Sequence, residues 1–238
     1  MQQRLGPGKC FLWVDENPEE LARVRAGEIV VSPVGKHDPK RVPDGLIHDW
    51  RGAVFIDHAS LADVMRVIRD YPRYKDIYRP SVVDSRLLPS SEADDRFSLL
   101  LMNKALLLKT AFDADYQYSY NRAGAHRIYS ISRTTRVQEI EDYGSPAQRL
   151  LNQGEGSGII WGLFAITRYM ERDGGVYIEV EAIGLSRDIP DSLRWLVDPM
   201  VRRFSRRAVA TSLDDIEKAV CDRAGVAFRA VASTRGSH

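Results

Sequence analysis

Alternating apolar and polar positions dominate the second half of the chain and predict two long neighbouring strands. Residues 157–172 carry this pattern, and residues 176–186 repeat it after the short segment Asp173-Gly174-Gly175. Alternation with a period of two is typical of a half-buried strand, and a short glycine-containing turn joins antiparallel strands. We therefore expect a long hairpin here, followed by an amphipathic helical region.

The earlier part of the chain predicts a meander of strands with two short helical segments. Ser60 is a suitable N-cap for a helix over residues 61–70, and Tyr71-Pro72 ends it before a second turn at residues 73–79. Residues 144–156 predict a loop. Strands are expected over residues 48–56, 82–88, 96–104, 106–120 and 126–140. Because the strands follow one another without intervening helices, the pattern predicts an antiparallel α+β fold and excludes a doubly wound nucleotide-binding fold.

Pro199 lies deep within the C-terminal helical pattern and predicts a break there. A proline inside a helix removes one hydrogen bond and clashes with the preceding turn. We expect one helix to end near Val197 and a second to begin with Asp198 as N-cap. Met200, Phe204 and Ala208 would then share one face of the second helix.

The first 45 residues predict an extension rather than part of the main domain. Asn17 can cap a short helix that has Pro18 at its first position, and Gly27 ends that helix. Residues 28–34 predict a strand, and residues 35–45 a linker. The expected organisation is an extension at 1–45, a domain at 46–225 and a flexible tail at 226–238.

The composition and net charge of the chain restrict its possible partners more than they restrict its fold. The 238 residues carry a net charge of +1, so steering of the whole molecule toward nucleic acid or an anionic membrane is not expected. No apolar run is long enough to span a membrane, and residues 1–8 lack the apolar core of a secretory signal. The chain as given is expected to be cytoplasmic, or secreted or periplasmic if a signal was trimmed. Cys10 and Cys221 are expected to be separate thiols.

Motifs for catalysis or metal binding are not evident in the sequence. The five histidines have no metal-binding spacing, and no GxSxG nucleophile elbow occurs. The glycine-rich residues 154–158 precede a predicted strand, whereas a phosphate loop lies between a strand and a helix. No metal, cofactor or catalytic residue is assigned, although a catalytic set assembled only in space stays open.

Two segments resemble the START-like, or SRPBCC, superfamily, closest to its uncharacterised bacterial members. Residues 174–181 and 183–190 resemble its last hairpin, and residues 67–74 and 78–82 resemble its first helices leading into the second strand. The superfamily includes steroidogenic lipid-transfer domains, birch-pollen-allergen-like proteins, polyketide cyclases and coenzyme Q-binding proteins. The resemblance implies a helix-grip fold. In this fold a curved antiparallel sheet wraps around a long C-terminal helix, and a hydrophobic cavity lies between the two.

Candidate ligand contacts follow from the faces of the predicted hairpin. On the first strand we expect the face of Trp161 to line the cavity, because the opposite face ends in charge; that face could instead dock a partner. On the second strand, Glu179 and Glu181 point either into water or into the cavity, where they would need a partner such as Arg133 or Arg136. The full candidate set is Tyr120, His126, Arg133, Trp161, Leu163, Tyr169, Tyr177, Glu179, Glu181, Trp195, Met200 and Phe204.

Three functions remain open at this point. The first is binding or transfer of a hydrophobic small molecule, such as a lipid, isoprenoid or quinone, sterol-like or aromatic compound, with Pro199 as a hinge. The second is a polyketide aromatase/cyclase-like enzyme that uses Tyr177, Glu179 or Glu181 as acid or base. The third is a protein-interaction module. A basic cluster at 202–207 leaves transient membrane contact open, and a homodimer also stays open.

Overall fold

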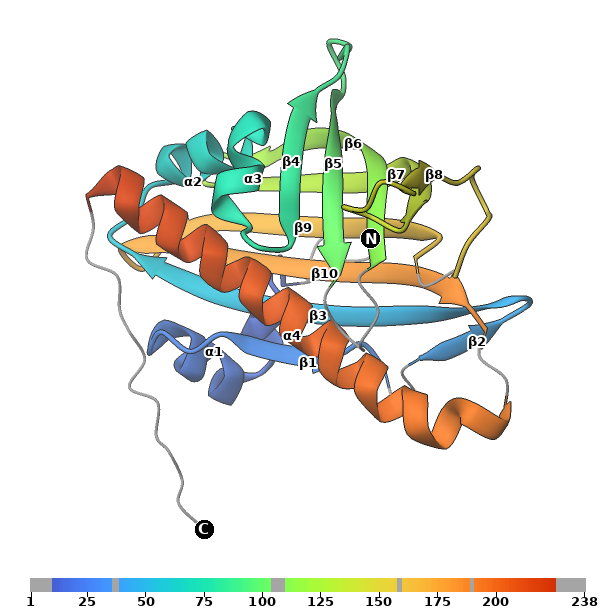
Figure 1. The fold of residues 1–238 in the computed structure, drawn as a ribbon. Helices are drawn as coiled ribbons and strands as arrows, with labels where there is room; N and C mark the ends of the chain where they lie inside the picture. Colours follow the sequence, from blue (N-terminus) through green and yellow to red (C-terminus); the bar gives the residue numbers. More distant parts are fainter. Residues whose placement is uncertain (1–9, 36–38, 104–109, 158–159, 189–190, 226–238) are drawn as a thin grey trace.

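The computed structural model describes residues 10–35, 39–103, 110–157, 160–188 and 191–225, and within it a curved ten-stranded antiparallel sheet faces one long helix (Figure 1). The strand order is β1-β3-β10-β9-β7-β6-β5-β4, with β2 on β3 and β8 on β7. The strands are β1 (Val30–Pro33), β2 (Lys40–Val42), β3 (Gly45–Asp57), β4 (Val82–Leu87), β5 (Asp95–Asn103), β6 (Thr110–Gly124), β7 (Arg127–Glu141), β8 (Arg149–Leu150), β9 (Gly162–Arg172) and β10 (Gly175–Arg187). The helices are α1 (Pro18–Arg25), α2 (Leu61–Ile68), α3 (Tyr74–Ile77) and α4 (Asp191–Ala224).

The predicted α+β helix-grip architecture is confirmed. The long hairpin forms from β9 and β10, and β10 pairs along its whole length with β3. Ser60 caps α2 in a capping box with Asp63, as the sequence predicts. No helix of the described residues is long and apolar enough to cross a membrane. Both cysteines are free; Cys10 is exposed and Cys221 buried.

The first part of the chain is built into the sheet, which the sequence did not predict. Asn17 caps α1 as expected, accepting hydrogen bonds from the backbone N–H groups of Glu19 and Glu20. β1 then pairs with the middle of β3, and β2, within the predicted linker, pairs with its start. The linker prediction is therefore wrong for Lys40–Val42, because a three-residue strand is too short to show alternation. The boundaries of the predicted domain and tail stay a prediction, and residues 226–238 lie outside the described residues.

Residues 11–14 cover the face of β10 that points away from α4. Together with Val24 and Val30 they pack against Ala53, Phe55 and Tyr177 in one buried cluster. Under this cover lies an ion pair between neighbouring strands: Arg168 Nη1 is 3.2 Å from Glu179 Oε1, and the two side chains are 4% and 1% exposed. The backbone N–H of Trp13 donates to Glu179 Oε2 at 2.5 Å. The N-terminal segment thus supplies part of the hydrogen bonding that a buried carboxylate needs.

The C-terminal helix is a single element, so the predicted break at Pro199 is wrong. α4 runs without interruption from Asp191 to Ala224. An interior proline destabilises a helix by about 3 kcal/mol. A helix of 34 residues can continue past it, because it retains most of its other hydrogen bonds. With no break between two helices, the structure gives no hinge at this position.

α4 lies close against the sheet at Gly52 of β3. A Cβ atom at that position would lie 2.6 Å from Val209 Cγ1 and 2.8 Å from Leu213 Cδ1, both on α4. Such distances are far inside van der Waals contact, so the missing side chain is what lets the helix lie on the strand. Leu213, Ile216 and other residues of α4 are buried there with Val54 and Ile56 of β3.

The buried face of α4 also carries a carboxylate. Glu217 is only 5% exposed. Burial and the nearby Asp214 raise the pKa of Glu217 to about 7, whereas Lys218 acts in the opposite direction. The folded protein therefore holds the proton of Glu217 more tightly than the unfolded chain does.

We expect Gly52→Ala to destabilise the protein by about 1–3 kcal/mol, because the added methyl group must displace Val209 or Leu213. Urea unfolding of both proteins measures the difference. Gly162→Ala is the matched control, since its Cβ would meet nothing nearer than Thr134 Oγ1 at 3.7 Å. Equal stability of wild type and Gly52→Ala would contradict the close contact.

We expect Glu179→Leu to cost about 3–5 kcal/mol, because it leaves the Arg168 guanidinium buried without its carboxylate. The double variant Arg168→Met/Glu179→Leu should recover much of this loss, leaving the unpaired N–H of Trp13 as the main deficit. Denaturant unfolding of the three proteins tests the pair. A single variant as stable as wild type would show that the ion pair is not buried as described.

We expect the stability of the wild type to fall relative to Glu217→Gln between about pH 5 and about pH 8. The raised pKa means that protonated Glu217 contributes stability below its unfolded pKa, and that this contribution is lost as the pH rises through about 7. Thermal unfolding across this range measures the difference, with the exposed Glu92→Gln as control. Parallel pH profiles for wild type and Glu217→Gln would exclude a raised pKa at this position.

Candidate functional site

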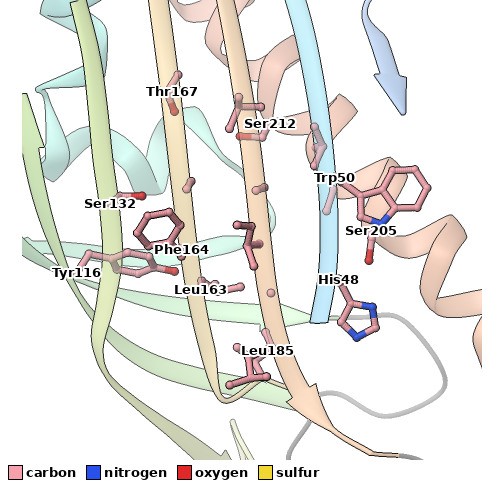
Figure 2. Close-up of a pocket in the computed structure, with 18 of the residues that line it drawn as sticks. His48, Trp50, Tyr116, Ser132, Leu163, Phe164, Thr167, Leu185, Ser205 and Ser212 are labelled. Carbon is pink, nitrogen blue, oxygen red and sulfur yellow. The ribbon is translucent and has the colours of Figure 1, made fainter. Parts of the chain in front are cut away.

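A cavity of about 500 Å³ lies between the concave face of the sheet and α4 (Figure 2). Alternate residues form its floor along most of β9 and β10, because successive side chains of a strand point to opposite faces. Phe164 and Ile183 also line it, near the end of β10. The floor residues are Leu163, Ala165, Thr167 and Tyr169 on β9 and Ile178, Val180 and Ala182 on β10. Across from the floor, α4 contributes Val201, Phe204, Ser205, Ala208 and Ser212, among others, at helical spacing.

Five tyrosines give the cavity an aromatic wall with hydroxyl groups. They are Tyr74, Tyr78, Tyr116, Tyr118 and Tyr169. Burial raises the pKa of each of these phenols, so all five stay neutral and can donate a hydrogen bond. The hydroxyl of Tyr74 already donates to the carbonyl of Ile68 at 2.6 Å. Among the described residues, the hydroxyls of Tyr78 and Tyr116 have no hydrogen-bond partner, so they are available to a ligand.

A stack of three rings holds Tyr116 in place. The ring of Phe97 lies nearly parallel to that of Tyr116, with centroids 5.3 Å apart. Tyr71 stacks on Phe97 at 4.3 Å. Because Phe97 and Tyr71 are almost fully buried, they fix the orientation of the Tyr116 ring at the cavity wall.

Among the described residues, the charged groups that line the cavity lie at one end, where β10 finishes. His48 Nε2 lies 2.9 Å from Ser186 Oγ, and Arg187 and Asp188 follow along the chain. Asp188 forms an ion pair with Arg41 at 3.1 Å. Phe204 lines the cavity and is also 40% exposed, which marks this end as the opening to solvent.

Three of the predicted ligand contacts lie on the cavity wall: Leu163, Tyr169 and Phe204. Leu163 and Tyr169 belong to the predicted inward face of the first hairpin strand, and the structure places that face toward the cavity. Tyr120 lies just beyond the wall, where its hydroxyl is 2.7 Å from that of Tyr71. Whether these residues bind a ligand stays a prediction.

The prediction that Tyr177, Glu179 and Glu181 of β10 face the cavity is wrong. Ile178, Val180 and Ala182 line the cavity, so Tyr177, Glu179 and Glu181 point to the opposite side of the sheet. Tyr177 donates its hydroxyl to Asp173 at 2.9 Å, and Glu179 pairs with Arg168. The alternative of glutamates in water is also wrong for Glu179, which is buried beneath residues 11–14. The alternation assigned the residues of β10 correctly to two opposite faces, but it did not show which face points toward α4.

The other predicted contacts lie away from the cavity or outside the description. His126 is exposed beside Glu171, Arg133 donates to Gln117, and Trp161 lies next to the opening with the Arg187 guanidinium 5.9 Å from its ring. The side chains of Trp195 and Met200 are outside the described residues.

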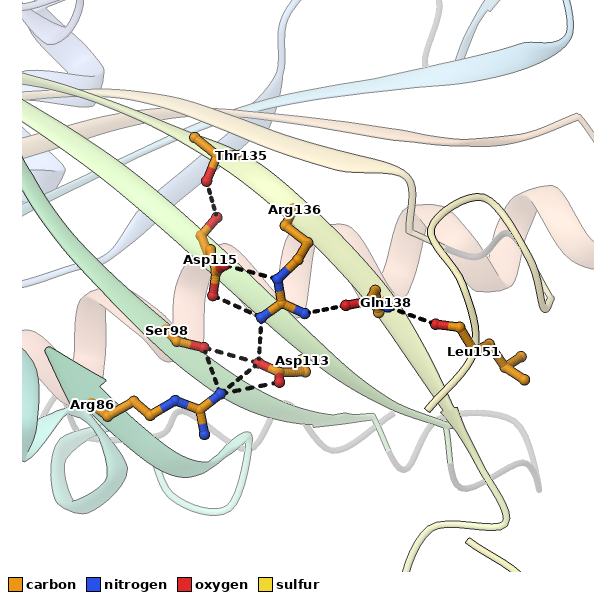
Figure 3. Close-up of polar contacts among 8 residues, drawn as sticks. All are labelled: Arg86, Ser98, Asp113, Asp115, Thr135, Arg136, Gln138 and Leu151. Carbon is orange, nitrogen blue, oxygen red and sulfur yellow. Dashed lines mark hydrogen bonds and ion pairs between the residues drawn. The ribbon is translucent and has the colours of Figure 1, made fainter. Parts of the chain in front are cut away.

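Arg136, considered as a partner for Glu179 or Glu181, instead belongs to a separate polar network on the face of β6 opposite its tyrosines (Figure 3). It bonds Asp115 at 2.8 Å and Asp113 at 3.2 Å, and Arg86 also bonds Asp113. The hydrogen bond from Arg136 lowers the pKa of Asp115 below its usual value. The network is consistent with a structural role in joining β4 to β7.

Several wall residues escaped the sequence analysis, although a signal existed for some. Tyr116 and Tyr118 recur at every second position with Tyr120, which was predicted, and this spacing indicates a shared face. His48 and Trp50 gave no signal, because their position at the cavity depends on the pairing of β3 with β10. Among the described residues, no group of three histidine, cysteine or carboxylate side chains could hold a metal ion.

Comparison with known proteins supports the fold and little else. No family model and no curated protein matches the chain. Among solved structures, a STAR-related lipid transfer protein from Xanthomonas axonopodis matches with 18% identity over 80% of this chain and 98% of its own, with a TM-score of 0.50. Human STARD10 matches with 10% identity over 93% of this chain and 85% of its own, with a TM-score of 0.51.

A third similar structure is the di-domain ARO/CYC BexL from the BE-7585A biosynthetic pathway. It has 13% identity, a TM-score of 0.50 and coverage of 76% of this chain and 51% of its own. Identities this low carry fold but not function. The chain therefore has the START-like helix-grip fold, with a cavity in the place where that fold encloses one.

Proposed function

We propose that the protein binds an uncharged, largely apolar small molecule between the concave face of its sheet and α4. The observation that carries this proposal is the cavity of about 500 Å³ with its aliphatic and aromatic wall. Pockets for single small molecules span roughly 300–1,000 Å³ and combine an apolar wall with a few polar groups. Burial of apolar ligand surface would supply the affinity, at about 25 cal/mol per Å² before the costs of association.

The distribution of charge supports an uncharged ligand body. Away from the opening, the ionisable groups on the described wall are phenols, and burial keeps them neutral. A charge on the ligand would lose its hydration there without gaining a counter-ion. A carbonyl or hydroxyl group, in contrast, could accept a hydrogen bond from Tyr78 or Tyr116. Any charged group of the ligand would be placed at the opening, near His48 and Arg187.

The two alternatives, a cyclase-like enzyme and an interaction module, depended on residues that do not line the cavity or form an open surface. A cyclase that uses Tyr177, Glu179 or Glu181 as acid or base needs that group in the cavity, but all three lie on the other side of the sheet. The interaction module required an open apolar face on β9, and Met170 of that face packs against the cluster formed by residues 11–14. Neither alternative gains an observation in its favour.

We expect Ala165→Phe to weaken binding of the uncharged dye Nile red at least about tenfold. Ala165 faces the lumen beside Ala182, so a phenyl ring there would occupy space meant for the ligand. Fluorescence titration measures the affinity, and thermal unfolding checks that the variant is folded.

Ala147→Phe is the matched control, because it adds the same ring at an exposed position in a loop. Its affinity for Nile red should equal that of wild type. Equal affinity of Ala165→Phe and wild type would show that the dye binds elsewhere, and no saturable binding by wild type would count against the cavity as a ligand site.

A further inference from the structure

The stretch of α4 beside the cavity opening is strongly basic although the whole chain is nearly neutral. Between Pro199 and Leu213 the sequence has four arginines and no acidic residue, against a net charge of +1 for all 238 residues. The four are Arg202, Arg203, Arg206 and Arg207, and each is exposed. At about 100° per residue they cover an arc of roughly 140° on the helix surface. The charge of this region is therefore concentrated on one side of one helix.

Among the described residues, these arginines differ from most others because none of them has a carboxylate partner. Within the part of the chain that the structure describes, none of the four forms an ion pair or hydrogen bond through its side chain. Elsewhere arginines such as Arg69, Arg86 and Arg223 form ion pairs with aspartates. Four like charges held together without compensation repel one another, which favours an external anionic partner.

An apolar strip runs along the same helix next to the arginines. Val201, Phe204 and Ala208 are spaced at i, i+3 and i+7, and all three line the cavity. Phe204 is 40% exposed, Ala208 is exposed and Val201 is partly so. Arg207 lies three positions after Phe204 and therefore next to it on the helix surface. The strip thus continues the cavity wall out to solvent, directly beside the basic arc.

We propose that this part of α4, residues 201–208, docks the protein on an anionic lipid bilayer with the cavity opening toward the membrane. Arginines beside an apolar strip match the two layers of a bilayer surface, because phosphates lie outermost and hydrocarbon lies below. The aliphatic stems of arginine can lie along the apolar surface while the guanidinium groups reach the phosphates. An apolar ligand could then move between cavity and bilayer with little exposure to water.

A bilayer fits these observations better than an acidic protein or a nucleic acid. An acidic protein would explain the arginines but not why the apolar strip is continuous with the cavity. A nucleic acid would also leave exposed Phe204 and the apolar strip unexplained. Docking does not depend on the proposed ligand-binding function, since the surface is present whether or not the cavity is filled.

The test measures partitioning of the full chain onto vesicles. One vesicle is pure phosphatidylcholine and the other contains about 30 mol % phosphatidylserine. We expect binding to the anionic vesicle alone, lost at about 0.5 M salt. Arg203→Gln/Arg207→Gln should bind the anionic vesicle about 30-fold more weakly, from about fivefold per arginine. The exposed pair Arg96→Gln/Arg122→Gln is the control, because it removes the same charge from the sheet rather than from α4.

The outcomes separate docking from ligand binding. Ala165→Phe should bind anionic vesicles like wild type even where it loses Nile red, because residue 165 lies inside the cavity. Wild type that fails to bind anionic vesicles, or that binds both vesicles equally, would overturn the proposal. So would an equal loss in the control pair, which would show that net charge alone matters. If the true partner were an acidic protein, wild type would fail to bind anionic vesicles.

Discussion

The contact between α4 and β3 at Gly52 sets the shape of the molecule. Only a residue without a side chain lets Val209 and Leu213 of the helix reach the strand. There the helix is buried with the sheet, whereas around Phe204 it lines an open cavity. A helix seated at one end and separated from a curved sheet at the other encloses space between them. The cavity is therefore a consequence of where the helix is anchored.

Most of β3 and the first half of β10 are buried, and both faces of these neighbouring strands are covered, which explains the chemistry of each side. Toward α4 they present small and aliphatic residues such as Val180 and Ala182, which leave room for a ligand. On the other side they present Tyr177 and Glu179, which the first residues of the chain cover. The buried charge is thus placed on the side that is closed by the protein itself. The cavity side keeps neutral hydroxyl groups and has charge only at its opening.

Most elements of the fold could be predicted from sequence because their signals are local. Alternation revealed the long strands, Ser60 and Asn17 marked helix starts, and the final hairpin resembled a known superfamily. The prediction at Pro199 also rested on a local rule, and it was wrong because α4 continues through this residue. The role of the first 45 residues was missed, because the burial of Phe11 or Trp13 depends on a sheet face formed by distant parts of the chain, from Phe55 to Glu179.

The site was less predictable than the fold, because a cavity is formed by several elements at once. Strand alternation separates two faces without telling which one the helix covers, so Glu179 was assigned to a ligand that it does not face. His48 and Tyr116 reach the wall through pairing of β3 with β10 and of β5 with β6. Such placement is a property of the assembled sheet. The alternation on β9, the tyrosine repeat on β6 and the helical spacing around Phe204 were visible in the chain.

The central claim is that the space between the sheet and α4 holds an apolar molecule. Native mass spectrometry of the protein purified from its own host, followed by denaturing extraction, tests it most directly. The account predicts a bound mass that is released on denaturation and partitions into organic solvent as an uncharged, largely apolar compound. A protein that is empty under native conditions and takes up no apolar compound from a host lipid extract would contradict it.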